Sequence, residues 1–179
     1  MEVDVVPAAE GDIGIVENLF VHYAHDLCEQ TGADVTEEGR FALPVTLSEY
    51  WHRSSNSPWP PDWRGFPFLL RVADRLAGFA LVRQISADTY DMGEFFVVRK
   101  YRRQGVGRRA ATAVFDRFSG NWEVRQMLTN LPAQSFWRRV IADYTAGRFS
   151  ETQEFFERYQ RAFVVQRFRR ERPVAPRQE

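Results

Sequence analysis

The clearest pattern of hydrophobic and polar positions lies in the middle of the chain, where three apolar runs follow one another with short polar breaks. The runs are rich in aromatic and β-branched residues, as buried strands are, and they cover residues 68–73, 76–85 and 89–98. Asp74 and Arg75 form a turn signal between the first two runs, and Gly78 predicts a bulge or a close backbone approach. The pattern predicts three consecutive antiparallel strands.

Apolar residues at three- and four-residue spacing predict a helix on either side of these strands. Between Val16 and Leu27 they recur behind Asp12, a candidate N-cap, and Gly32 marks the end of this first helix. Residues 106–118 repeat the spacing immediately after the third strand. The third strand therefore runs through a short loop into a helix.

Shorter patterns predict the elements around this centre. Residues 2–6 alternate briefly, which indicates a first strand, and residues 47–53 indicate a short helical piece. Residues 122–129 predict a strand that arrives after a helix, so we expect it to lie parallel to its neighbour.

The C-terminal third has weaker patterns. Residues 144–149 and 161–168 predict two closing antiparallel strands, joined by a turn or short helix at residues 152–159. The end of the chain, residues 171–179, is polar and interrupted by proline, so we expect a flexible tail.

Residues 33–67 predict a long irregular segment that is unusually aromatic. Its aromatic residues are Tyr50, Trp51, Trp59, Trp63 and Phe66. Two interpretations stay open: the aromatic side chains form a wall of a binding site, or together with proline they fix a long loop to the body of the protein.

Composition restricts the class of protein. A chain of 179 residues with 44% hydrophobic content can bury one substantial core, so we expect one domain. The formal net charge is zero, which argues against an overall electrostatic attraction to nucleic acid or to an anionic membrane. Cys28 is the only cysteine and no apolar run approaches 20 residues, so a cytoplasmic protein is expected, without a disulfide inside the chain.

The loop between the third strand and its helix carries the strongest chemical signal. Gly105 and Gly107 remove side chains where a helix begins, so unpaired backbone N–H groups can approach a ligand closely. The positive end of the helix dipole and the surrounding arginines favour an anion at this point. The loop is therefore a candidate site for a phosphate or pyrophosphate.

The run from Arg102 to Gly107, Arg-Arg-Gln-Gly-Val-Gly, matches the Arg/Gln-x-x-Gly-x-Gly/Ala signature of the GCN5-related N-acetyltransferases (GNAT superfamily), in the same strand-loop-helix setting. A second segment, from Asn130 to Trp137, resembles the Asn-x-x-Ala-x-x-Phe-Tyr segment of that family, which implies that a helix follows Asn130. The resemblance implies an α/β (α+β) domain over residues 1–170. It also implies a mixed sheet of about six or seven strands, antiparallel in its N-terminal part, with about four helices.

The resemblance implies acetyl-CoA as co-substrate and an amine as acceptor. Phe96, Val97 and Val98 occupy the strand that binds the thioester through backbone N–H groups. The residues that the resemblance places at the remainder of the cofactor are Arg102, Arg103, Gln104, Gly105, Val106, Gly107, Arg108, Asn130, Phe136 and Trp137. No metal is implied.

Acetyl transfer to an amine needs a base that removes a proton from the nucleophile. Glu94 is the only carboxylate within the apolar part of the strand that enters the site, and apolar surroundings would raise its pKa. The alternative is a glutamate that points to solvent. Trp137 stands where the family commonly has a tyrosine that protonates the leaving sulfur, and Tyr144 is a candidate substitute.

Two functions from different classes are compatible with this sequence. The first is an N-acetyltransferase acting on a primary amine of a small molecule or a peptide, and the second is an acyl-CoA-binding regulatory module without turnover, which Trp137 keeps open. A nucleic-acid binder fits the neutral net charge poorly, and no membrane partner is expected. A homodimer is compatible with the resemblance.

Overall fold

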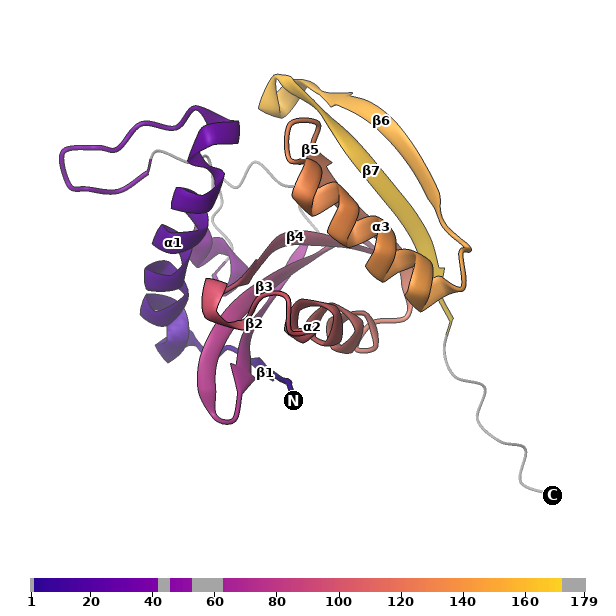
Figure 1. Cartoon of the computed structure of the whole chain (residues 1–179), viewed down its shortest axis with the longest axis horizontal. Helices are drawn as coiled ribbons and strands as arrows, with labels where there is room; N and C mark the ends of the chain where they lie inside the picture. The colour runs from indigo at the N-terminus through magenta and orange to yellow at the C-terminus, as the bar shows by residue number, and fades with distance from the viewer. Residues whose placement is uncertain (1, 42–45, 53–62, 172–179) are drawn as a thin grey trace.

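One seven-stranded sheet with helices on both faces forms the described part of the chain, residues 2–41, 46–52 and 63–171 of a computed structural model (Figure 1). The strand order is β1-β2-β3-β4-β5-β7-β6, and only β4 and β5 are parallel neighbours. The strands are β1 (Asp4–Pro7), β2 (Arg64–Val72), β3 (Arg75–Ser86), β4 (Thr89–Val97), β5 (Gly120–Met127), β6 (Ser150–Phe156) and β7 (Arg161–Arg170). The predicted mixed sheet is confirmed.

Three α-helices lie within the described residues, where about four were predicted. They are α1 (Ile13–Thr31), α2 (Val106–Phe115) and α3 (Leu131–Thr145). The predicted helical piece at residues 47–53 is a single 3₁₀ turn, Leu47–Tyr50. No helix among the described residues is long and apolar enough to cross a membrane.

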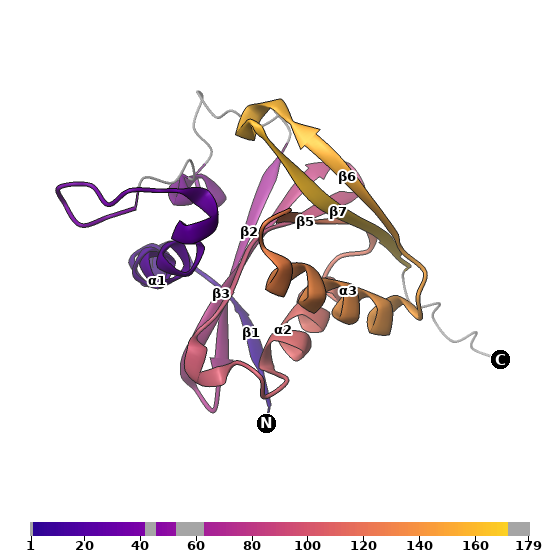
Figure 2. The same ribbon diagram turned by 45° about the horizontal axis from the view of Figure 1, so that its top comes forward.

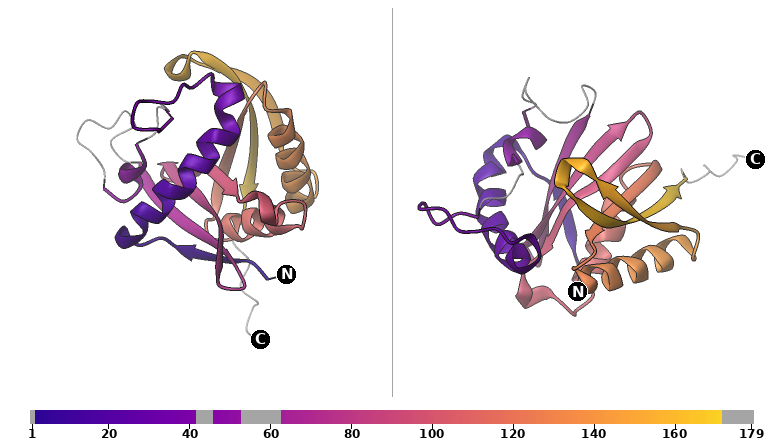
Figure 3. Two further views of the ribbon diagram at one scale, coloured as in Figure 1. Left: turned by 60° about the vertical axis from the view of Figure 1, so that its left-hand side comes forward. Right: turned by 90° about the horizontal axis from the view of Figure 1, so that it is seen from above.

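The sheet separates two hydrophobic cores. Helix α1 covers one face, and α2 and α3 cover the other, as Figures 2 and 3 show from different sides. On the α1 face Val16 packs with Phe79 and Leu81, whereas on the opposite face Trp122 packs with Phe115. Because neighbouring strand residues point to opposite faces, β3 supplies both cores from alternate positions.

The hairpin from β2 to β3 turns one residue earlier than predicted. Ala73 and Asp74 both have positive φ, at 47° and 61°, which is the backbone of a two-residue hairpin turn whose twist matches that of the strands. The bulge expected near Gly78 is confirmed, since the register of β2 and β3 shifts between Leu70 and Arg71, opposite Gly78.

Two C-terminal predictions are wrong. The segment 144–149 is not a strand, because α3 continues to Thr145 and packs Tyr144 against Phe115 and Phe168. Residues 152–156 belong to strand β6, and only Glu157–Tyr159 form the predicted short helix between the two strands. Strand β6 lies at the edge of the sheet with most of its side chains exposed, so its sequence lacks the hydrophobic alternation on which strand prediction depends.

Some of the sequence expectations concern residues outside the described part. These are residues 42–45 and 53–62 of the irregular segment, which include Trp59 and the last residue of the predicted helical piece, and the tail from residue 172 to residue 179.

Candidate active site

A β-bulge at Gly93 shapes the centre of the site. Met92 pairs with Val82 and Glu94 pairs with Leu81, so Gly93 is an extra residue in β4. A Cβ at Gly93 would meet the Tyr50 hydroxyl, and it would lie 3.0 Å from the guanidinium carbon of Arg83. The close approach of these two side chains therefore requires glycine at the bulge.

The bulge also places two carboxylates on the same face of the sheet. Residues three apart in a regular strand point to opposite faces. Because Gly93 is inserted between them, Asp91 and Glu94 both point to the face that carries α1. Asp91 lies beside Arg83 of β3 in the register of the two strands.

The parallel strands β4 and β5 separate immediately beyond this point. Their pairing begins at Thr89 with Asn121 and ends at Met92 with Val124. After it, β4 continues against β3 alone, and β5 continues against β7 alone. The sheet is therefore open between the second half of β4 and the end of β5.

Some backbone N–H groups of β4 face this opening. They are not the full set of N–H groups that was predicted to bind the thioester. The N–H of Val98 donates to the carbonyl of Ala77 at 2.8 Å, so it points toward β3. Because N–H directions alternate along an antiparallel pair, the N–H of Phe96 also points toward β3, and those of Phe95 and Val97 point into the opening. Of the three predicted thioester residues, only Val97 offers an N–H there; Phe96 and Val98 do not.

A cavity of about 620 Å³ passes through this opening and touches both faces of the sheet. Helix α1, the 3₁₀ turn Leu47–Tyr50, β4, β5, α3 and the connection between β6 and β7 all contribute side chains to its wall. The lining includes Tyr23, Glu49, Tyr50, Trp63, Arg83, Asp91, Glu94, Phe95, Arg125, Gln126, Asn130, Trp137, Arg158, Tyr159 and Arg161. This size suits a small-molecule ligand.

Glu94 lies in this cavity with its carboxylate held by α1. The hydroxyl of Tyr23 donates to Glu94 Oε2 at 2.6 Å. Burial raises the pKa of Glu94, although the charge of Arg83 and the hydrogen bond from Tyr23 partly offset this increase. Burial and the neighbouring carboxylate raise the pKa of Tyr23 well above its ordinary value, so Tyr23 stays a hydrogen-bond donor.

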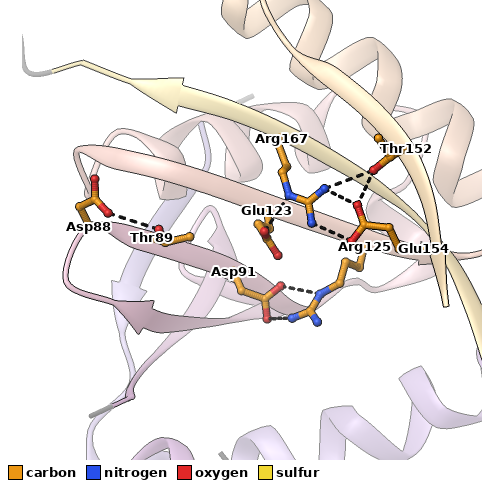
Figure 4. A network of polar contacts seen from close by, with 8 residues as sticks. All are labelled: Asp88, Thr89, Asp91, Glu123, Arg125, Thr152, Glu154 and Arg167. Carbon is orange, nitrogen blue, oxygen red and sulfur yellow. Dashed lines mark hydrogen bonds and ion pairs between the residues drawn. The ribbon is translucent and has the colours of Figure 1, made fainter. Parts of the chain in front are cut away.

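Asp91 binds two arginines at the bottom of the cavity (Figure 4 shows the contact with Arg125). Arg83 Nε donates to Asp91 Oδ2 at 2.8 Å, and Arg125 Nη2 lies 2.7 Å from the same oxygen. Asp91 has no exposed surface. Burial alone would raise the pKa of Asp91, but the two guanidinium groups outweigh it and hold the pKa below its ordinary value.

The row of charges continues across β5, β7 and β6 outside the cavity. Arg167 of β7 donates to Glu123 of β5 at 2.7 Å and to Glu154 Oε2 of β6 at 2.9 Å (Figure 4). Thr152 donates to Glu154 at 2.5 Å. These contacts join three strands on the same face of the sheet as Asp91.

The loop that was predicted to bind an anion lies directly before α2. Gly105 has a φ of 77°, a conformation that glycine adopts without strain, and Arg103 also has a positive φ of 59°. Among the described residues, no acceptor is found for the backbone N–H groups of Arg103, Gln104 and Gly105, and the first N–H groups of a helix lack acceptors inside it. The loop therefore presents a series of free N–H groups.

Side chains of the signature hold the loop in place. Arg102 Nε donates to the Val97 carbonyl at 2.6 Å, and its other end binds Asp26 of α1. Gln104 donates to the carbonyl of Lys100 at 2.7 Å. Arg103 and Arg108 are exposed, and Val106 is buried under α2. Of these residues, Arg102 and Gln104 donate hydrogen bonds to carbonyl groups of the protein's own backbone.

Gly107 permits close packing between α2 and α3. A Cβ at Gly107 would lie 3.2 Å from the ring of Phe136. Trp137 packs edge to face on Phe95, with ring centroids 5.1 Å apart, and lines the cavity together with Asn130. The Asn130 side chain accepts from the Ala133 N–H at 3.2 Å and caps α3.

Tyr144 is not brought to the site. Its hydroxyl donates to Asp116 at the end of α2 at 2.8 Å, and the cavity lining does not include it. Burial and Asp116 raise the pKa of Tyr144 to about 12. Seven residues of α3 separate it from Trp137, so the two side chains lie roughly 10 Å apart along the helix axis.

Several cavity residues were missed by the sequence analysis. Tyr23 and the group of Arg83, Asp91 and Arg125 were not predicted as site residues, whereas Tyr50 belonged to the aromatic segment for which a binding-site wall was one of two open interpretations. Arg83 and Asp91 each interrupt an otherwise apolar strand, and this was a signal that could have marked them. Tyr23 had no comparable signal, since it belongs to the regular apolar spacing of α1.

Comparison with known proteins agrees with this geometry. Residues 33–141 match the model of the acetyltransferase (GNAT) family. The chain belongs to this family. This acetyltransferase has no match among curated protein sequences.

Solved structures similar to this acetyltransferase share its fold at low sequence identity. The ribosomal-protein-S18-alanine N-acetyltransferase from Escherichia coli is 17% identical over 98% of each chain, with a TM-score of 0.56. A Bacillus subtilis acetyltransferase in complex with CoA is 12% identical over 94% of this chain and 99% of its own, with a TM-score of 0.60. Ard1 from Thermoplasma volcanium is 15% identical over 93% of this chain and 97% of its own, with a TM-score of 0.57.

Proposed function

We propose that this acetyltransferase moves the acetyl group of acetyl-CoA to a primary amine by direct attack of the amine on the thioester. The observation that carries the proposal is the position of Glu94: a carboxylate with a raised pKa lies in a ligand-sized cavity, at the point where β4 and β5 separate. The Bacillus subtilis structure described above contains CoA, which supports this class of co-substrate.

The chain fits acetyl-CoA at two places. The free N–H groups between Arg103 and Arg108 suit the phosphates, because they combine with the positive end of the α2 dipole. The N–H groups of Phe95 and Val97 suit the pantetheine arm and the thioester oxygen in the opening between the strands. When bound, acetyl-CoA supplies an activated acetyl group.

Glu94 takes the proton of the acceptor. An amine arrives mostly protonated at neutral pH and attacks only as the neutral base. Burial brings the pKa of Glu94 closer to that of the amine, which makes proton transfer to the carboxylate less unfavourable. Tyr23 holds the carboxylate oriented through its hydrogen bond.

The departing thiol needs no protein acid in this proposal. A thiol has a pKa of about 8.5, so its thiolate is a tolerable leaving group near neutral pH. The indole of Trp137 packs on Phe95 and cannot supply a proton at this pH. Tyr144 is bound to Asp116 outside the cavity, so we do not assign it this role.

The replacement of Glu94 by glutamine tests the proposal. We expect Glu94→Gln to retain acetyl-CoA affinity and to lower kcat for an accepted amine by roughly 10²-fold near neutral pH. Activity of the wild type should fall as the pH drops through the raised pKa of Glu94, and the variant should recover as the pH approaches the pKa of the amine. Thiol release from acetyl-CoA with a panel of amines measures both.

Glu123→Gln is the matched control, because Glu123 lies on neighbouring strand β5 but outside the cavity lining. It should keep the wild-type pH profile. A Glu94→Gln variant with wild-type rate and an unchanged acid limb would contradict the assignment of Glu94. Binding of acetyl-CoA without thiol release across the whole panel would instead favour the regulatory acyl-CoA-binding module.

A further inference from the structure

One side chain in the wall of the cavity lacks a hydrogen-bond partner at both of its polar atoms. Gln126 of β5 is only 4% exposed, and among the described residues neither its Nε2 nor its Oε1 forms a hydrogen bond. The large majority of buried polar groups in folded proteins are bonded, because an unpaired one costs free energy. Since Gln126 lines the cavity, its carboxamide marks a contact that a ligand completes.

Gln126 points to the face of the sheet that α3 covers. Burial alternates along β5, and the buried positions Trp122 and Val124 belong to the core on the face of α2 and α3. Gln126 continues this alternation, so its side chain is on the same face. Ala133 and Trp137 of α3 line the cavity together with it. The carboxamide is therefore on the opposite face of the sheet from the proposed base.

Gln126 also borders the opening between the parallel strands. The pairing of β4 with β5 ends at Met92 and Val124, two residues before Gln126. On its other side Gln126 pairs with Val164 of β7. Phe95 of β4, whose N–H points into the opening, lines the same cavity. An extended ligand in the opening thus has N–H groups of β4 on one side and the carboxamide of β5 on the other.

The amide groups of CoA match this carboxamide. A primary carboxamide has N–H donors and an oxygen acceptor, so another amide satisfies both kinds of atom at once. The pantetheine arm of CoA contains two amides separated by methylene groups. Phe95 and Trp137 supply apolar surface in the same cavity wall, which suits the methylene groups. The amine acceptor fits this position less well, since it must reach the proposed base on the other face.

We propose that the Gln126 side chain pairs with an amide of the pantetheine arm, Nε2 donating to the amide carbonyl and Oε1 accepting from the amide N–H. This pair fixes how far the arm enters the opening and thereby places the thioester relative to Glu94. The inference rests on the proposed acetyl transfer for its co-substrate and does not depend on the identity of the acceptor.

The replacement of Gln126 by methionine tests the inference, because methionine is unbranched like glutamine but lacks its hydrogen-bonding groups. Isothermal titration calorimetry gives the affinity for CoA and for adenosine 3′-phosphate 5′-diphosphate, which keeps the phosphates of CoA but lacks its arm. We expect Gln126→Met to bind CoA roughly 10- to 100-fold more weakly than the wild type does, and the nucleotide equally well. Unchanged affinity for CoA, or equal losses for the two ligands, would overturn the inference.

The unfolding midpoint of the ligand-free protein is a second readout. Removal of a buried amide without a partner should leave the midpoint of Gln126→Met unchanged or raise it, even though CoA binding weakens. A lower midpoint would show that the amide is bonded inside the protein. Gln166 Oε1 of β7, which also lacks a partner among the described residues, is the nearest such acceptor in the register of the strands. This outcome would overturn the inference.

Gln134→Met is the matched control. Gln134 of α3 is also buried, at 5% exposure, but it does not line the cavity, and its Nε2 donates to the carbonyls of Met127 and Leu128 at 3.0 Å each. This variant should show the reverse result, a lower unfolding midpoint with unchanged CoA affinity. The same loss of CoA affinity in Gln134→Met as in Gln126→Met would attribute the effect to packing and overturn the inference.

These measurements separate the inference from the proposed function, because they require no acetyl transfer. Selective loss of CoA affinity in Gln126→Met would support the inference even if no amine were acetylated. Acetyl transfer by the wild type, combined with unchanged CoA affinity in Gln126→Met, would overturn the inference and leave the proposed function standing. Absence of CoA binding to the wild type would overturn both.

Discussion

The hydrogen bond between Tyr23 and Glu94 sets the orientation and the proton affinity of the proposed base. The Tyr23 ring is fixed by edge-to-face contacts with Phe79 and Phe96, at centroid distances of 5.7 and 6.0 Å. Its hydroxyl therefore meets Glu94 from one direction only. Because a donor favours the ionised carboxylate, this bond lowers the pKa of Glu94 and partly opposes the effect of burial.

The replacement of Tyr23 by phenylalanine should move the acid limb of the pH profile. Without the hydroxyl, the pKa of Glu94 rises further, so its basic form exists only at higher pH. We expect Tyr23→Phe to lose activity near neutral pH and to regain it as the pH is raised, with unchanged acetyl-CoA affinity. A pH series of thiol release measures the shift.

Tyr144→Phe provides the comparison, because Tyr144 is bonded to Asp116 and lies outside the cavity lining. Its pH profile should match that of the wild type. If Tyr23→Phe changed the rate equally at every pH, the hydroxyl would act only through packing.

At the level of single residues, the burial of Glu94 was predictable and its surroundings were not. Glu94 is a carboxylate inside an apolar run, which the sequence displays directly. Its partner Tyr23 lies 71 residues earlier, so only the packing of α1 on the sheet brings the two together. The unpaired Gln126 carboxamide depends in the same way on tertiary contacts.

At the level of elements, the loop between β4 and α2 is the most autonomous part of the site. Its glycine conformation, its free N–H groups and the start of α2 all follow from a few consecutive residues. Local sequence was therefore sufficient to predict it. Strand β6 is the opposite case, since pairing with β7 makes it a strand despite its polar sequence.

The replacement of Gly105 tests this loop. No atom lies within 4 Å of a Cβ placed at Gly105, so a side chain fits there, but the φ of 77° strains any residue other than glycine. Gly105→Glu should largely abolish acetyl-CoA binding, because it adds a negative charge where phosphates approach. Isothermal titration calorimetry with acetyl-CoA measures the loss.

Gly105→Ala shares the backbone strain without the charge. We expect it to weaken acetyl-CoA binding much less than Gly105→Glu does, while both variants show similar unfolding midpoints. Equal and complete loss in the two variants would attribute the effect to loop distortion. Unchanged affinity in Gly105→Glu would contradict the assignment of this loop as the phosphate site.

At the level of the whole molecule, the ion pairs across the sheet link stability to pH. Hydrogen bonds from Arg167 and Thr152 lower the pKa of Glu154 from 4.5 to about 2. A carboxylate with a lowered pKa stabilises the folded state at pH values above its unfolded pKa, and this contribution disappears as the pH falls through the folded value. Glu154 therefore contributes to acid unfolding between about pH 4.5 and pH 2.

Glu154→Gln should reduce this dependence. We expect a lower urea midpoint than that of the wild type at pH 7, and a smaller difference between the two proteins as the pH is lowered from 4.5 toward 2. Urea unfolding at several pH values measures both. Glu171→Gln, a change at an exposed position after β7, is the control and should follow the wild-type curve.

The overall sheet was predictable because the hydrophobic patterns of the central strands and the order of elements agree with one topology. The opening in it was not derivable from these patterns. Gly93 marks a possible bulge no more clearly than other strand glycines do, and the separation of β4 from β5 depends on β5 pairing with β7. The cavity is therefore a property of the assembled sheet.

The extra residue in β4 has a consequence for how this strand can pair with β3. If Gly93 were taken up into regular pairing, strict alternation would turn Glu94 to the α3 face and bring Phe95 to the α1 face in its place. A shift of pairing by one residue, without any change of sequence, would thus exchange the proposed base for a phenyl ring. Deletion of Gly93 would instead leave Glu94 opposite Leu81 on the α1 face, so the bulge matters for the space beside Tyr50 and Arg83 and the register matters for the base.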